Sequence, residues 1–128
     1  MKTTKILYLL GVLAFASTAI ATEPATAAPK QFLGILRLTE RLYVDTAWTK
    51  EDSDAVGQHF LRLKEEAKKR KVIFAGRTLE PGDKTMGLVV FEAVNLREAE
   101  EFMSADPAVI AGVMKAEVHP YQIAVARE

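Results

Sequence analysis

The stretch VIFAGRTLEPGDKTMGLVVFEA, residues 72–93, contains two apolar runs separated by a turn signal. Val72–Thr78 is rich in β-branched and aromatic residues, and Gly87–Ala93 is a second run of this kind, so both are predicted to be strands. The tripeptide Pro81-Gly82-Asp83 between them is typical of a turn. The sequence therefore predicts a β-hairpin in the middle of the fold.

A helix is predicted on each side of this hairpin. Upstream, Thr49-Lys50-Glu51-Asp52 has the pattern of a capping box, and the helix after it is expected to run to about Arg70. Its apolar face is expected to consist of Val56, Phe60, Leu63 and Ala67. Its charged residues are expected on the opposite, solvated face: Arg62, Lys64, Glu65, Lys68 and Lys69. Downstream, Asn95 is the predicted N-cap of a helix that includes Leu96 to Met103.

Two further strands complete the pattern. Phe32–Leu38 reads as a buried strand, and Val113–Ala126 as the last strand, where Pro120 indicates a bend or an edge. Thr39–Lys50 is then a long connection, a kind of segment that is often functional. Asp106-Pro107 is expected to start a short helix that ends near Gly112.

The resulting order is β-α-β-β-α-β, which is the ferredoxin-like arrangement of the α+β class: one antiparallel sheet with helices on one face. The other face of such a sheet lacks a helical cover. Small proteins of this type often bury that face against a second copy, so we expect a homodimer.

The first 21 residues have the pattern of a secretory signal peptide. Two lysines precede the apolar stretch Ile6–Ile20, which ends in the small residues of Ala19-Ile20-Ala21. The stretch is shorter than the roughly 20 residues that a membrane-spanning helix needs. We expect cleavage after Ala21, with Ala27 as the alternative, which would leave a secreted or periplasmic protein without a stable membrane span.

Residues 22–31 are rich in Pro, Ala and Thr and are expected to be a flexible spacer before a single domain at 32–126. The full chain has 128 residues with 17 Lys plus Arg and 17 Asp plus Glu. This balance gives no electrostatic footprint for nucleic acid. The absence of cysteine excludes disulfides and thiolate zinc sites. Two separated histidines are only a weak indication of a metal site. No cofactor motif is present, so no cofactor is expected.

The two histidines are His59 and His119. His59 lies at the border of the apolar helix face, where an imidazole can take and return a proton near neutral pH. A carboxylate on one ring nitrogen would fix the tautomer, and the candidates are Asp106, Asp45 and Glu117. Spacing does not choose between them. The alternative interpretation is that His59 is hydrogen-bonded to backbone and that Asp106 serves only as a helix cap.

Arg77 and Thr78 follow Gly76 near the end of a predicted strand, where glycine permits the close approach of a ligand. An arginine there suits a carboxylate or phenolate group, and the alternative is a surface ion pair. Trp48 and Tyr43 either line a pocket or simply pack.

Several of these segments together resemble the YCII-related family over roughly residues 32–126. They are Gln58-His59-Phe60-Leu61, Gly76-Arg77-Thr78, Asp106-Pro107-Ala108-Val109 with Gly112, and Glu117-Val118-His119-Pro120-Tyr121. The resemblance implies a ferredoxin-like fold of the dimeric α/β-barrel type. It also implies an active-site dyad of His59 and Asp106.

A related enzyme of this scaffold eliminates chloride from a chlorinated hydroxyquinol. The resemblance therefore implies cofactor-free acid–base chemistry, lyase- or isomerase-like, on a small molecule in a pocket near the dyad. In this interpretation Arg77, Thr78 and Trp48 bind the substrate. Two alternatives stay open, namely a non-catalytic cell-envelope dimer that binds a small ligand and a structural dimer with a vestigial pocket.

Overall fold

The computed structural model describes residues 27–128, so the expected signal peptide and its cleavage after Ala21 lie outside the described residues. The regular elements follow the expected order, with a short third helix before the last strand. The strands are β1 (Lys30–Leu38), β2 (Val72–Arg77), β3 (Met86–Ala93) and β4 (Met114–Pro120). The helices are α1 (Lys50–Lys68), α2 (Leu96–Ser104) and α3 (Pro107–Ile110).

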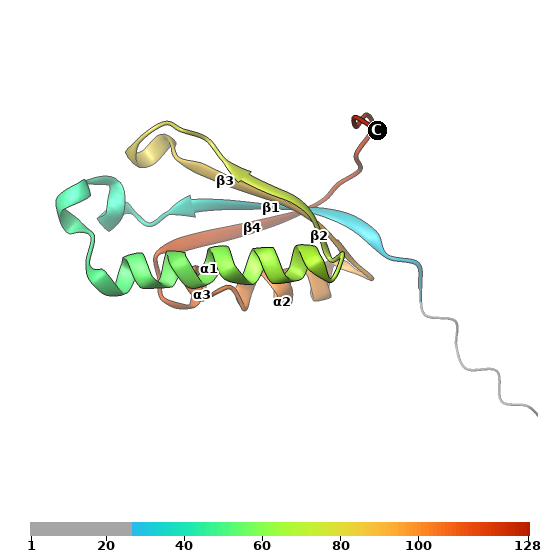
Figure 1. Ribbon diagram of the computed structural model, residues 1–128, viewed down its shortest axis with the longest axis horizontal. Coiled ribbons are helices and arrows are strands. Elements are labelled where there is room, and N and C mark those ends of the chain that lie inside the picture. The colour runs from blue at the N-terminus through green and yellow to red at the C-terminus, as the bar shows by residue number, and fades with distance from the viewer. Residues whose placement is uncertain (1–26) are drawn as a thin grey trace, which may run out of the picture.

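The four strands form one antiparallel sheet in the order β2-β3-β1-β4. The helices lie on one side of this sheet, and β1 runs through its middle (Figure 1). The predicted hairpin is confirmed by the pairing of β2 with β3. The chain is therefore an α+β protein with the ferredoxin-like arrangement.

The main core lies between the sheet and α2. Phe32 and Phe91 on the inner strands pack with Phe102 of α2, and the rings of Phe91 and Phe102 are 4.7 Å apart. Met103 of α2 lies directly over Gly34, where a Cβ atom would come within 2.6 Å of its Cε. Gly34 therefore faces the helices, and because side chains alternate along a strand its neighbours face the opposite side of the sheet.

Helix α1 starts as the sequence predicts. The Thr49 hydroxyl accepts from the Asp52 backbone N–H at 3.2 Å, and the Asp52 carboxylate accepts from the Thr49 backbone N–H at 3.0 Å, which confirms the capping box. The predicted apolar face is only partly correct, because Leu63 is buried while Phe60 and Ala67 are exposed. Helix α1 therefore packs on the sheet through few apolar contacts.

The connection before α1 has more structure than the sequence suggested. It contains two 3₁₀ turns, η1 (Glu40–Tyr43) and η2 (Asp45–Ala47). The guanidinium of Arg41 binds both carboxylate oxygens of Asp52 at 2.8 and 3.0 Å, and this pairing holds the pKa of Asp52 well below its usual range. The ion pair attaches the connection to the first turn of α1.

The first and last strands in the sequence each differ from the prediction at one end. Strand β1 begins at Lys30, so Lys30 and Gln31 belong to the sheet and not to the expected spacer. Strand β4 ends at Pro120 and not at Ala126, since proline has no N–H to donate to the ladder. No helix within residues 27–128 is long and apolar enough to cross a membrane.

Candidate active site

The structure brings His59 and Asp106 together from distant parts of the chain. His59 lies in the middle of α1, and Asp106 is the residue before α3. Nδ1 of His59 is 2.8 Å from Oδ2 of Asp106, with the histidine side chain 13% exposed and the aspartate 1% exposed. Of the three candidate partners for His59, the structure selects Asp106.

Asp106 is also the N-cap that the sequence predicts. Its Oδ1 accepts from the Ala108 backbone N–H at 2.9 Å, while Oδ2 is left for His59. Burial alone would raise the pKa of Asp106. The hydrogen bond and electrostatic attraction from the His59 ring, the Ala108 backbone N–H and the Arg62 cation together outweigh burial, so the pKa of Asp106 lies below its ordinary value.

An ionised Asp106 fixes the proton arrangement of His59. A carboxylate only accepts hydrogen bonds, so Nδ1 carries the proton that it donates to Oδ2. Nε2 has no hydrogen-bond partner within residues 27–128, and no buried side-chain nitrogen there is left unpaired. Nε2 is therefore accessible, and it is the ring atom that can exchange a proton with a ligand.

Arg62 is the third member of this cluster, although the sequence placed it on the solvated face of α1. Its Nη2 donates to the Phe102 carbonyl at 2.8 Å, and its Nη1 lies 3.4 Å from Oδ2 of Asp106. The guanidinium also covers the Phe102 ring at 4.3 Å. Arg62 thus links α1 to the segment between α2 and α3, where Asp106 lies.

A cavity of about 710 Å³ lies beside His59, between α1 and the sheet. Its walls come from α1 and from strands β1, β2 and β3, with Met114 of β4 at one side. The volume is in the range of small-molecule binding sites. The cavity exists because the apolar face of α1 is only partly packed on the sheet.

Arg77 reaches the same cavity from the opposite wall. It pairs with Gly87, which pairs with Leu36 on the next strand. Partners in a ladder share a face, and Leu36 is buried under the helices, so Arg77 stands on the helix side of the sheet. The structure therefore places His59 and Arg77 in the walls of one cavity.

Trp48 and Thr78, the other two predicted binding residues, do not line this cavity. The Trp48 indole N–H donates to the Leu42 carbonyl at 3.1 Å, and its ring packs on the small cluster around Leu42. The Thr78 hydroxyl accepts from the Met86 backbone N–H at 2.9 Å. Both contacts hold loops in place at the edge of the fold.

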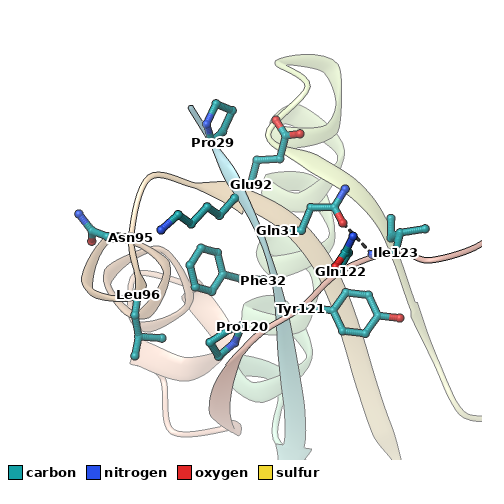
Figure 2. Close-up of a pocket in the computed structure, with 11 residues that line it drawn as sticks. Pro29, Gln31, Phe32, Glu92, Asn95, Leu96, Pro120, Tyr121, Gln122 and Ile123 are labelled. Carbon is teal, nitrogen blue, oxygen red and sulfur yellow. Dashed lines mark hydrogen bonds between the residues drawn. The ribbon is translucent and has the colours of Figure 1, made fainter. Parts of the chain in front are cut away.

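A second hollow, of about 640 Å³, lies where β1 begins and the C-terminal segment leaves the sheet (Figure 2). There the Gln31 side chain accepts from the Ile123 backbone N–H at 2.8 Å. None of the predicted site residues lines this hollow. The cavity beside His59 is therefore the candidate active site.

The fold and the buried histidine–carboxylate pair define a ferredoxin-like domain with an acid–base group beside a cavity. The YCII-related domain matches residues 39–122, and the chain belongs to the YCII-related family. Among solved structures, the chain is similar to 5-chloro-2-hydroxyhydroquinone dehydrochlorinase from Burkholderia phenoliruptrix in complex with 2,5-dihydroxybenzoquinone. That similarity has 20% identity and a TM-score of 0.47, and it covers 71% of this chain and 93% of that chain. No curated protein matches the chain.

Proposed function

We propose that this protein is a small-molecule enzyme that uses His59 as its general acid and base. The observation that carries the proposal is the 2.8 Å contact between His59 Nδ1 and a buried Asp106, in a histidine that lines a cavity. A buried carboxylate that holds one ring nitrogen is the arrangement that prepares the other nitrogen for proton transfer.

In this proposal each residue has a separate task. Nε2 of His59 removes a proton from the bound molecule and returns it at another atom or to a leaving group. Asp106 keeps the imidazole in one orientation and stabilises its protonated form. Arg77 holds an anionic part of the substrate. A proton removed and returned in this way gives a lyase- or isomerase-like reaction.

The test is proton exchange in deuterium oxide. A panel of small organic acids and phenols with an acidic C–H bond is incubated with the protein, and NMR follows deuterium uptake, elimination and isomerisation. His59→Gln is expected to lower the rate by about 100-fold or more, the usual contribution of a positioned general base. Far-UV circular dichroism checks that the variant is folded.

His119→Gln is the matched control, because His119 is an exposed histidine on β4 outside the cavity. It is expected to keep the wild-type rate. Equal rates in His59→Gln and the wild type would contradict the proposed function. Saturable binding without any chemical change, at equal affinity in both proteins, would instead favour a non-catalytic binding protein.

We also propose that the protein is exported and acts as a homodimer. Export rests on the signal-peptide pattern of residues 1–21. The dimer is supported by the sheet face opposite the helices, which carries the half-buried apolar residues Leu33 and Ile35 of β1 and Leu88 of β3. Ile35→Glu is expected to yield a monomer in light scattering, and an unchanged mass would rule out this face.

A further inference from the structure

The cavity beside His59 has a one-sided charge pattern. Among the residues that the structure describes, three ionisable ones line it, His59, Lys64 and Arg77, and no aspartate or glutamate does. The remaining wall is apolar apart from the hydroxyls of Ser53 and Thr85. A cationic ligand would find no counter-charge there, whereas an anionic ligand would find two.

Within residues 27–128, neither Lys64 nor Arg77 contacts a carboxylate. The other lysines and arginines of α1 each contact a carboxylate: Lys50 contacts Asp54, Arg62 contacts Asp106, and Lys68 contacts Glu65. Lys64 instead lies over the Phe60 ring at 5.4 Å. Arg77 has no ion pair or side-chain hydrogen bond within the part of the chain that the structure describes. Their charges remain available to a ligand.

One wall of the cavity is kept open by a glycine of α1. A Cβ atom at Gly57 would meet nothing within 4 Å. Gly57 lines the cavity, and it has no positive φ that would require glycine. Glycine in a helix is less favourable than alanine, and packing gives no reason for it at Gly57. Its effect is to leave room in the cavity for a bound molecule.

We propose that this cavity selects small organic anions with a flat or compact apolar body. The anionic group binds between Arg77 and Lys64, and the apolar body lies against Val56, Leu63 and Met114. This proposal rests on the proposed function, because it describes which molecules the proposed enzyme would bind as substrates. The proposal itself concerns binding, and it is tested without turnover.

The probe is cinnamate, with cinnamamide as its uncharged isostere and cinnamylamine as its cationic counterpart. Titration calorimetry at low ionic strength gives the dissociation constants. The wild type is expected to bind cinnamate about tenfold more tightly than cinnamamide, as expected for a charge-assisted hydrogen bond. Cinnamylamine is expected to bind weakest.

Arg77→Met and Lys64→Met are each expected to reduce the preference for cinnamate over cinnamamide severalfold. Lys115→Met is the matched control, because Lys115 is an exposed lysine of β4 that does not line the cavity. It is expected to keep the preference. Gly57→Leu fills the cavity and is expected to abolish binding of both compounds, whereas retained binding would place them elsewhere.

The proposal is overturned if the wild type does not bind cinnamate, if it binds cinnamamide equally well, or if neither cavity variant changes the preference. These results are independent of catalysis. His59→Gln can remove all proton exchange while the preference for anions stays, and the preference can fail while His59 still exchanges protons. Failure of the substrate class and failure of the enzyme proposal are therefore distinguishable.

Discussion

Asp106 combines two tasks, as the N-cap of a helix and as the partner of His59. One oxygen caps α3 and the other holds His59, so the same buried carboxylate fixes a helix and an imidazole. The two tasks are compatible because a carboxylate has more than two acceptor positions. The position of the dyad therefore depends on the start of a four-residue helix.

Two substitutions of Asp106 should separate these tasks. Asp106→Asn loses the charge but keeps an oxygen for the Ala108 N–H, so it should destabilise the protein less than Asp106→Ala does. Asp106→Ala removes both the cap and the partner of His59 and should cost about 3 kcal/mol, as for other broken buried pairs. Urea unfolding measures both.

Ring-nitrogen NMR then reports the tautomer of His59. The wild type should show a proton on Nδ1, and Asp106→Asn should show a mixture of tautomers, because an amide can donate as well as accept. An unchanged Nδ1–H signal in Asp106→Asn would mean that the carboxylate does not set the tautomer.

At this scale, the sequence predicted the contact between His59 and Asp106 better than their surroundings. Residue type and capping rules are local, so His59 and Asp106 were both among the candidates that the structure brings into contact. Arg62 was wrongly predicted to lie on the solvated face. That prediction used its charge and ignored its position three residues after His59. That spacing puts both side chains on one side of α1, and the signal was present in the sequence.

At the scale of elements, the sheet and α1 use glycine for opposite reasons. Gly34 is required by packing, since Met103 occupies the place of a side chain, while the space at Gly57 is open. The two positions therefore form a natural comparison.

Gly34→Ala should destabilise the protein by about 1 kcal/mol, because the flexible end of Met103 must shift within a closed core. Gly57→Ala should stabilise it by a similar amount, about 1 kcal/mol, through helix propensity. Thermal unfolding of both variants tests the pair. If Gly57→Ala lowered the midpoint, the assignment of Gly57 to open space would be wrong.

Helix starts were predictable at this scale because a cap depends on four or five neighbouring residues, as at Thr49 and Asn95. The turns η1 and η2 were not predicted. They depend on contacts with residues outside the segment, such as the pairing of Arg41 with Asp52. The exposure of Phe60 was also missed, since helical spacing does not reveal how closely a helix approaches its sheet.

At the scale of the whole molecule, buried and paired carboxylates set the response to acid. The pKa values of Asp106, Asp52 and Glu98 all lie below their ordinary values. A lowered folded pKa contributes stability that is fully present above the unfolded pKa, about 3.9 for aspartate, and that is lost as pH falls through the folded value. Wild-type stability should therefore decrease toward acid pH.

Arg62→Met should weaken this dependence. Without the cation, the pKa of Asp106 moves up toward its unfolded value, so the contribution of Asp106 is smaller and is lost at higher pH. Urea unfolding at a series of pH values from neutral to acid measures the effect, with Lys115→Met as control. A profile that differs from the wild type only by a constant offset would show that Arg62 has no electrostatic effect on Asp106.

The topology was predictable because four strand signals and two helix signals in this order leave few arrangements open. The cavity was not predictable, since it is formed by residues from α1 and all four strands at distances that no local pattern fixes. The approach of Lys64 and Arg77 to one space became evident only from the assembled fold.

The position of β1 also has a consequence for the order of events during synthesis. The earliest strand to be translated lies inside the sheet, and its two neighbours are β3 and the last strand, β4. Its pairing with β4 must therefore wait for nearly the whole described domain to emerge, and such distant pairing slows folding. A nascent chain that lacks β4 would expose one edge of its central strand, so chaperone binding and protease sensitivity should both persist until β4 has been added.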